Sequence, residues 1–345
     1  MSGKIGVAII GSGIFVKEQH LPAVQKSPDL ELKAIYSRSL KSAKSVSEGL
    51  SDVALYSEDS GSESFTDLLH RSDIRAVIIA LPIPVQPTFI KEALRAGKHV
   101  LAEKPLAKDV AAGRELIDFC RLPDVTPTFG VAEQFRYLNA YLHAASEVKG
   151  LGRVLGVQLR MHALVLLGGK YIETPWRKAP EYQGGFLLDG GVHQIAALRL
   201  VLAGGGVKVR SVSAHTAQLQ RHLPPVDTVD AALALDNGAT GLVSMSFGST
   251  FKSNELAVAC ENGTVTVVRD RVTVTRVGGE PKVEDKVNEE GGVATEVFAW
   301  AKSILSGKQD PQQSPEEALA DLELLEAMLT SGEKDGAPVK LSYQI

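Results

Sequence analysis

Residues 4–16, KIGVAIIGSGIFV, join a short apolar run to two closely spaced glycines. An apolar run without polar alternation is typical of a strand that is buried on both faces of a parallel sheet. Gly11 and Gly13 then allow a tight turn into a helix, which we expect at residues 17–26. A buried strand, a glycine turn and a helix in this order predict the start of a doubly wound α/β sheet.

The same alternation of buried strands and helices continues through the first third of the chain. Further strands are expected at residues 31–36, 75–81, 98–102 and 126–132. Because parallel strands need crossover connections, and helices usually supply them, this pattern predicts a Rossmann domain. We place this dinucleotide-binding type of domain at residues 1–125 and a C-terminal domain at residues 126–345.

The second part of the chain has short alternating strands separated by turn signals. The tripeptides DNG at 236–238 and ENG at 261–263 are typical of hairpin turns. They predict an α/β domain with an open, mostly antiparallel sheet, and two helices near residues 294–305 and 315–331 close the chain. The polar segment 278–292 is expected to be a flexible loop.

The overall charge and cysteine content exclude several classes of protein. Lysines and arginines number 37 against 41 aspartates and glutamates, so the net charge is 37 − 41 = −4. No basic stripe stands out, which argues against nucleic acid or a membrane surface as partner. Cys120 and Cys260 form no metal-binding pattern, so we expect no metal and a reducing, cytoplasmic location. No stretch approaches the roughly 18 apolar residues of a membrane span.

The glycine turn at residues 11–16 nearly fits the pattern G-x-G-x-x-G. The second glycine lets backbone N–H groups approach a pyrophosphate at the helix N-terminus. Val16 stands at the third glycine position, so a plain glycine turn is the alternative. Its place between the first strand and its helix favours a nicotinamide dinucleotide site. The residues expected at the cofactor are Gly11, Gly13, Ile14 and Phe15.

The end of the second strand bears on which nicotinamide cofactor is preferred. A site for NAD(H) places Asp or Glu there to bind the ribose 2′-hydroxyl, whereas this chain has Tyr36-Ser37-Arg38. Ser37 and Arg38 suit a 2′-phosphate, because a guanidinium forms bidentate contacts with phosphate. We therefore predict NADP(H). NAD(H) is the alternative if Arg38 is only a solvated residue.

Glu103, Lys104 and Pro105 directly follow the strand expected at 98–102. Ligands of open parallel sheets bind beyond the carboxyl ends of the strands, so Lys104 is expected near the nicotinamide. An ammonium group there can donate to a substrate oxygen that gains negative charge as hydride arrives. The alternative is an ordinary surface lysine at a strand end.

Asp189 and His193 lie four residues apart in GGFLLDGGVH, residues 184–193. On a helix they share one face, where a carboxylate can tune an imidazole for proton transfer. The alternative is an aspartate that caps the helix and a packed histidine. Upstream, an arginine that could bind a polar substrate group lies beside a tryptophan that could wall a pocket or belong to the core. These candidate substrate residues are Trp176, Arg177 and Tyr182.

Taken in order, these motifs resemble the glucose-fructose oxidoreductase, inositol dehydrogenase and rhizopine catabolism family (Gfo/Idh/MocA). The resemblance covers nearly the whole chain and is most similar to a fungal cytosolic NADPH-dependent branch. It is carried by Gly11-x-Gly13, His20-Leu21-Pro22-Ala23, Leu81-Pro82, Glu103-Lys104-Pro105, Trp176-Arg177, Gly184-Gly185 and Asp189-x-Gly191-x-His193.

The resemblance implies roles for further residues. Lys104, Asp189 and His193 match the family's acid–base set, and the Lys104–Pro105 peptide bond is expected to be cis. The exposed face of the C-terminal sheet is expected to pair subunits into a homodimer or homotetramer. The resemblance adds Leu81, Pro82, Glu103 and Lys104 to the cofactor site and Glu133 and Phe186 to the substrate site.

Departures from the family pattern bear on the substrate. Ile83 and Gln86 stand where relatives have an Asn and a His that help to frame cofactor and substrate. Phe186 replaces the third glycine of a triplet. Because Ile83, Phe135 and Phe186 are apolar, a less polar substrate such as an aldehyde or ketone is expected.

The leading interpretation is an NADP(H)-dependent oxidoreductase that reduces a carbonyl group or oxidises the matching alcohol. Lys104 donates to the forming alkoxide, His193 shuttles the proton and Asp189 orients the imidazole. The alternative is a non-catalytic dinucleotide-binding regulator on the same fold, since fold does not fix function. A redox-neutral glycosidase that retains NAD is the third interpretation.

Overall fold

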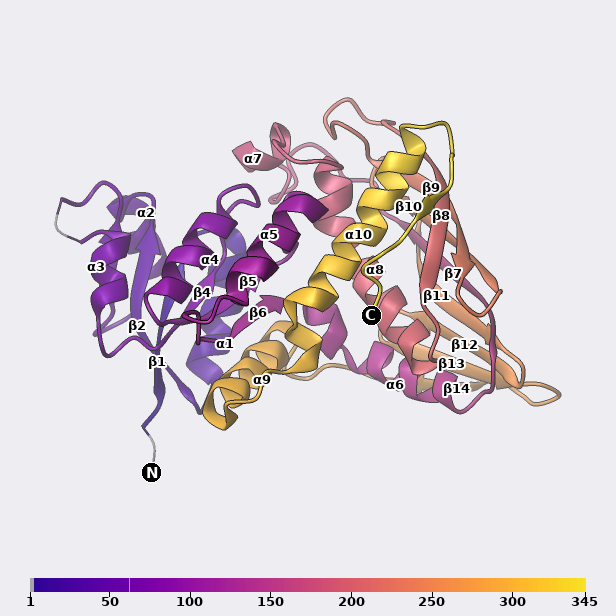
Figure 1. Ribbon diagram of the computed structural model, residues 1–345, viewed down its shortest axis with the longest axis horizontal. Helices are drawn as coiled ribbons and strands as arrows, with labels where there is room; N and C mark the ends of the chain where they lie inside the picture. Colours follow the sequence, from indigo (N-terminus) through magenta and orange to yellow (C-terminus); the bar gives the residue numbers. More distant parts are fainter. Residues whose placement is uncertain (1–2, 62) are drawn as a thin grey trace. The chain divides into compact units, whose positions relative to one another are not determined.

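The computed structural model describes residues 3–61 and 63–345, which form two compact units (Figure 1). Unit 1 holds the residues up to Glu133 and the segment Glu290–Ala318, and unit 2 holds Gln134–Glu289 and Leu319–Ile345. The predicted division, with one boundary after residue 125, differs from this arrangement. The reason is that a sixth parallel strand and a helix from much later in the chain both belong to unit 1.

Unit 1 is built on a six-stranded sheet with the order β3-β2-β1-β4-β5-β6, in which neighbouring strands are parallel. This confirms the predicted doubly wound sheet. β1 is buried along its whole length, as its apolar run predicted. The strands are β1 (Ile5–Ile10), β2 (Leu30–Ser37), β3 (Ala54–Ser57), β4 (Ala76–Ile79), β5 (His99–Glu103) and β6 (Phe129–Ala132).

Helices connect these strands. The expected first helix is confirmed, although it begins as the π-helix η1 (Val16–His20) before α1 (Leu21–Lys26). α9 (Gly292–Ser306) comes from far along the chain and lies against η1 and α1 (Figure 1). The remaining helices of unit 1 are α2 (Leu40–Val46), α3 (Phe65–His70), α4 (Gln86–Arg95), α5 (Val110–Cys120) and η3 (Pro311–Gln313).

Unit 2 is built on a nine-stranded sheet with the order β14-β13-β12-β11-β7-β10-β9-β8-β15. Only the β7–β10 pair is parallel among the pairings described, so the predicted open, mostly antiparallel sheet is confirmed. The strands are β7 (Val154–His162), β8 (Val209–Ala217), β9 (Thr228–Leu235), β10 (Thr240–Ser246), β11 (Ser253–Cys260), β12 (Gly263–Val268), β13 (Arg271–Arg276), β14 (Lys282–Asp285) and β15 (Val339–Lys340).

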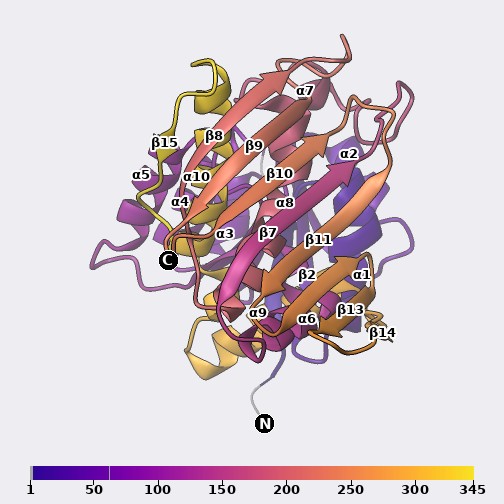
Figure 2. The same cartoon turned by 90° about the vertical axis from the view of Figure 1, so that its right-hand side faces the viewer.

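Two helices cover one face of this sheet, α6 (Asn139–Lys149) and α8 (Gly185–Gly204). Figure 2 shows the other face, over which the described chain lays no helix. The remaining helices are η2 (Gln134–Tyr137), α7 (Pro175–Lys178) and α10 (Pro315–Gly332), which begins in unit 1 and ends in unit 2.

α8 is long and apolar enough to cross a membrane by length and composition, the one such helix in the described part of the chain. The expectation that no stretch approaches a membrane span is therefore wrong on these two criteria. However, 72% of its apolar window is buried inside the fold. Because a core helix satisfies the same criteria, we assign α8 as the central helix of unit 2.

A buried ion cluster ties α10 to the rest of unit 2. The Arg136 guanidinium donates to Asp321 Oδ1 and Oδ2 at 2.7 and 2.6 Å. Arg199 of α8 donates to Asp321 Oδ1 at 2.6 Å. All three side chains are at most 7% exposed, so one buried carboxylate pairs with two buried guanidinium groups.

Candidate active site

The glycine turn lies at the carboxyl end of β1 and needs glycine at its first position. Gly11 has a φ of +132°, and a Cβ there would lie 2.3 Å from the Ala80 carbonyl oxygen. A Cβ on Gly13 would meet no atom within 4 Å among the described residues, so the backbone is open to an approaching phosphate. Val16, at the third glycine position, is a buried core residue at the start of η1. The turn therefore fits a dinucleotide without its third glycine.

The end of β2 lies beside this turn. The hydroxyl groups of Ser12 and Ser37 are hydrogen bonded at 2.7 Å, and Arg38 follows with an exposed side chain. The Tyr36 hydroxyl donates to Glu58 Oε1 at 3.1 Å. Burial, followed by the charge of Glu58, raises the pKa of Tyr36. The predicted pair Ser37 and Arg38 is thus brought together with the glycine turn.

The end of β5 carries Glu103, followed by Lys104 and a cis peptide bond to Pro105, as the resemblance implied. Two side chains hold this strand end. His20 Nε2 lies 2.7 Å from Glu103 Oε1, and Gln86 Nε2 donates to the Glu103 carbonyl oxygen at 3.1 Å. Since β1 and β5 belong to one parallel sheet, Lys104 and the glycine turn lie at the same edge.

Leu81 and Pro82 follow β4 at this edge and are half-buried. Two other residues that were assigned to substrate or to its frame lie inside unit 1. Glu133 is 3% exposed and Ile83 is 2% exposed. Both side chains are buried, and their part at a substrate stays a prediction.

A buried carboxyl group that the sequence interpretation missed lies on α9. Glu296 is 0% exposed, and neither carboxyl oxygen has a hydrogen-bond partner among the described residues. Burial, then the negative charges of Glu103 and Glu133, raise the pKa of Glu296 well above its usual value, and Lys104 acts in the opposite direction. The uncharged form of a buried acid is therefore favoured in the electrostatic surroundings of Lys104.

In unit 2, Asp189 and His193 lie one turn apart on α8, as predicted. Arg177 Nε donates to Asp189 Oδ2 at 2.6 Å, and its guanidinium carbon lies 4.0 Å from the Trp176 ring centroid. The imidazole of His193 stacks on Phe135 with 4.8 Å between ring centroids. The structure therefore joins Asp189 to two of the residues predicted for the substrate.

Tyr182 belongs to the same group of side chains. Its ring centroid lies 5.9 Å from that of Trp176, and its buried hydroxyl has no hydrogen-bond partner among the described residues. Burial, and then the charge of Asp189, raise the pKa of Tyr182. Phe186 lies edge to face with Phe247 at 5.0 Å. Tyr182 is thus a buried hydroxyl beside the Arg177–Asp189 pair.

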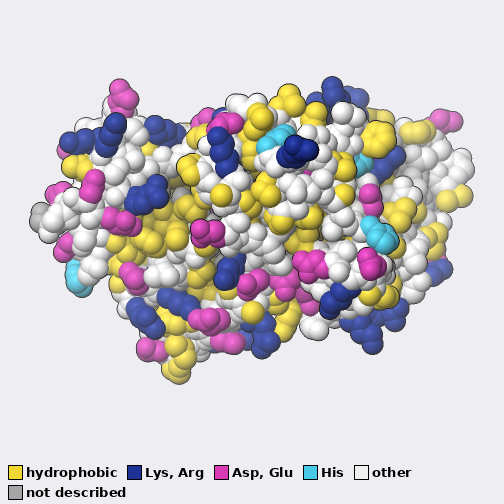
Figure 3. All heavy atoms as spheres, turned by 90° about the horizontal axis from the view of Figure 1, so that it is seen from above, with side chains coloured by type: hydrophobic (Ala, Val, Ile, Leu, Met, Phe, Trp, Pro, Cys, Tyr) yellow, Lys and Arg dark blue, Asp and Glu magenta, His cyan; other side chains and the backbone are white. Residues whose placement is uncertain are grey.

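Surface charge does not single out either unit. Basic and acidic side chains are interspersed over the face shown in Figure 3, in keeping with the net charge of −4. Within residues 3–61 and 63–345, no three His, Cys, Asp or Glu side chains are grouped so that they could hold a metal ion.

Comparisons with known proteins identify both parts of the chain. Residues 5–130 match the oxidoreductase family with an NAD-binding Rossmann fold, and residues 140–266 match the Gfo/Idh/MocA C-terminal domain. The chain is 41% identical over 350 residues to dehydrogenase FPY6 of Fusarium mangiferae, covering 99% of this chain and 100% of the relative.

Two further comparisons cover nearly complete chains. D-xylose 1-dehydrogenase (NADP(+)) 2 of Haloferax volcanii is 28% identical over 354 residues, covering 99% of each chain. The crystal structure of an oxidoreductase from Thermotoga maritima superposes with a TM-score of 0.88 at 28% identity, covering 99% of this chain and 100% of the other. With the geometry above, these matches show that the chain belongs to the Gfo/Idh/MocA family of NAD(P)-dependent oxidoreductases.

Proposed function

We propose that this protein is an NADP(H)-dependent oxidoreductase that interconverts a carbonyl compound and the matching alcohol, with Lys104 as acid and base. The observation that carries the proposal is the position of Lys104. It follows β5 at the same sheet edge as the glycine turn. When bound there, the nicotinamide exchanges a hydride with the substrate carbon.

The preference for NADP(H) is supported by the end of β2. Arg38 is exposed directly after Ser37, which is bonded to the glycine turn through Ser12. A guanidinium and a hydroxyl can bind the 2′-phosphate with charge-assisted hydrogen bonds. The relative from Haloferax volcanii is named for NADP(+), which supports the same preference.

The role of Lys104 is supported by the way its strand end is held. His20 and Gln86 fix Glu103, and so restrict the backbone that carries the Lys104 side chain. An ammonium held in place can donate to an alkoxide without reorganisation, which is the main source of such catalysis. We also propose that His193 and Asp189 take part in proton movement. Only the family motif supports these two roles.

An assay of NADPH oxidation tests this function. The purified protein is offered a panel of sugars, aldehydes and diketones, and NADPH binding is measured separately by fluorescence. Lys104→Met is expected to lower kcat by about 10²–10⁴-fold with NADPH affinity unchanged. The exposed Lys108, four residues further on, provides the control Lys108→Met, which keeps wild-type kcat.

Three results contradict the proposal in different ways. An unchanged kcat in Lys104→Met refutes the role of Lys104. Tight NADPH binding by the wild-type protein without turnover of any compound in the panel favours the regulator instead. Cofactor that stays bound and is not consumed while a glycoside is cleaved favours the redox-neutral glycosidase.

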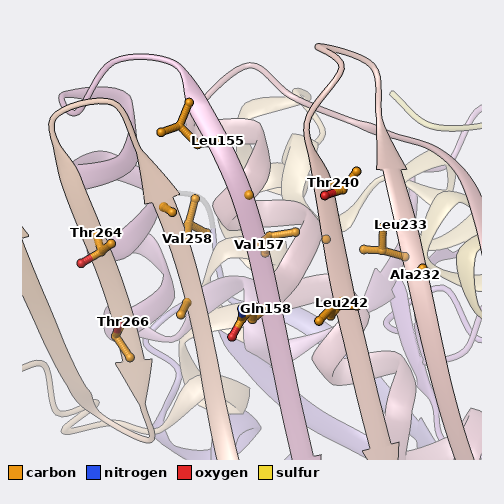
Figure 4. Close-up of a pocket in the computed structure, with 14 residues that line it drawn as sticks. Leu155, Val157, Gln158, Ala232, Leu233, Thr240, Leu242, Val258, Thr264 and Thr266 are labelled. Carbon is orange, nitrogen blue, oxygen red and sulfur yellow. The ribbon is translucent and has the colours of Figure 1, made fainter.

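We also propose that the open face of the unit 2 sheet pairs subunits into a homodimer or homotetramer. Figure 4 shows the apolar groove on its strands, in which Leu155 and Leu242 are 45% and 55% exposed. Exposed leucines beside the small side chains of Ala232 and Ala257 support a buried interface. We also propose a cytoplasmic location. It is supported by Cys120 and Cys260, which are free cysteines.

A further inference from the structure

α9 presents an apolar face to the core of unit 1, and Glu296 lies on that face. Val293, Trp300 and Ile304 are buried there, and Glu296 stands three residues after Val293 and four before Trp300. A hydrophobic residue at this position would stabilise the fold more than a buried carboxyl group without partners. The fold alone therefore does not explain Glu296.

The strand register brings other titratable groups to this place. Glu103 of β5 and Ala132 of β6 are partners in the parallel strand register, and each is the last residue of its strand. Lys104 and Glu133 therefore begin the loops that follow these neighbouring strands. η1 also packs against α9, and its His20 is bonded to Glu103 at 2.7 Å. Three carboxyl groups, one imidazole and one ammonium group are thus gathered at the carboxyl edge of the sheet.

The helix α1 also packs against α9, but it adds no charged side chain to the titratable groups at the strand ends. In α1 the titratable residue is Lys26, whose side chain is 58% exposed and pairs with Glu290 at 3.3 Å. The electrostatic surroundings of Glu296 are therefore those of the strand ends.

These surroundings favour the uncharged form of Glu296. Burial and the charges of Glu103 and Glu133 together hold its pKa well above the ordinary value. Its carboxylic proton is therefore available to a stronger base nearby, and the neutral amine form of Lys104 is such a base.

We propose that Glu296 holds a proton in reserve for Lys104. In each turnover Glu296 gives this proton to the Lys104 amine. The inference rests on the proposed acid–base role of Lys104. Glu296 acts through Lys104, which makes it a positioning residue for the proton. In unit 1 its two buried carboxyl oxygens, unpartnered among the described residues, are the geometric basis of the inference.

The proton balance of the step is simple. In the reducing direction Lys104 gives one proton to the oxygen of the new alcohol and becomes a neutral amine. Glu296 gives its carboxylic proton to this amine and becomes a carboxylate, and one proton from solvent then returns to the Lys104–Glu296 pair. No electrons move in these transfers, and one solvent proton is consumed for each carbonyl group reduced. Oxidation of the alcohol runs the same steps in reverse.

Infrared spectroscopy tests the reserve without any turnover. The difference spectrum of the wild-type protein minus Glu296→Gln, both saturated with NADP(+) at neutral pH, is expected to contain the carbonyl stretch of a protonated carboxylic acid. The control is Glu323→Gln, which removes a buried glutamate that accepts from the Tyr343 N–H in unit 2. If the protonated band is missing for Glu296, the proposal is wrong.

Kinetics test whether Lys104 uses the reserve. With the panel compound that is reduced fastest, Glu296→Gln is expected to lower kcat by about tenfold or more, with KM within about twofold. The loss should grow as pH rises, because solvent protons then become scarce, and Glu296→Asp should recover part of it. Parallel pH profiles for Glu296→Gln and wild type overturn the proposal. If Lys104→Met keeps its turnover, the proposed function fails first, and the reserve fails with it.

Discussion

Replacing Glu296 by glutamine is expected to change how the free energy of unfolding depends on pH. In the folded protein the pKa of Glu296 is raised well above 4.5, first by burial and then by Glu103 and Glu133. In the unfolded chain the group ionises near that usual value. Above about pH 4.5 the folded state therefore binds more protons than the unfolded state, so this group makes stability fall as pH rises. The fall continues until the pH reaches the folded-state pKa.

The size of the effect follows from proton linkage. One group that is fully protonated when folded and ionised when unfolded contributes a slope of about 1.4 kcal/mol per pH unit. Glutamine has a similar shape and no proton to lose. The free energy of unfolding of Glu296→Gln should therefore gain about 1.4 kcal/mol on the wild type for each pH unit within this window.

Urea unfolding followed by tryptophan fluorescence measures this difference. Trp300 lies in the core of unit 1, four residues from Glu296, so a Trp176→Phe background makes the signal report unit 1. The same series on Glu323→Gln shows the effect of losing a hydrogen-bonded buried glutamate elsewhere. If the free energies of unfolding of the wild type and Glu296→Gln change with pH at equal slopes, Glu296 is ionised in the folded protein. That result would refute both this reasoning and the proton reserve.

Three further changes test other parts of the structure. Arg38→Ala should weaken NADPH binding by about 2 kcal/mol, or roughly thirtyfold, and leave NADH binding nearly unchanged. Titration with both cofactors measures this difference. Equal losses for the two cofactors would contradict a 2′-phosphate contact. Asp321→Asn leaves Arg136 and Arg199 buried without their shared carboxylate. The free energy of unfolding, measured with urea, should fall by about 3–5 kcal/mol. A change below about 1 kcal/mol would show that the cluster is solvated. Leu242→Arg places a charge on the open sheet face and should yield monomers in size-exclusion chromatography with light scattering, whereas an unchanged mass would place the interface elsewhere.

Much of the fold could be predicted because its signals are local. The apolar run of β1 and the hairpin turns at 236–238 and 261–263 each lie within a few residues of the structure that they specify. The strand β14 was missed within the expected loop 278–292. It is an edge strand whose side chains, Lys-Val-Glu-Asp, are largely exposed, so it has no apolar alternation to detect. Charged edge strands are common because they discourage pairing with other chains.

The domain boundary illustrates a second limit. α9 supplies Val293, Val297 and Trp300 to the core around β1, although the sheet of unit 2 lies between them in the sequence. A boundary inferred from a change in pattern along the chain cannot detect such a return. The apolar face of α9 predicts that the helix is buried, but it does not indicate against which sheet.

The same reasoning explains why the candidate site could be found only in part. Glu103 and Lys104 are adjacent in one motif, so their proposed role can be inferred from the sequence. Glu296 comes under their electrostatic influence only through the tertiary position of α9. Its one sequence signal is a glutamate at an apolar position of an amphipathic helix. Such a residue conflicts with the pattern that builds the fold, and conflicts of this kind are expected at functional sites. Because an apolar side chain would stabilise the core better, Glu296 is consistent with the role that we propose for it beside Lys104.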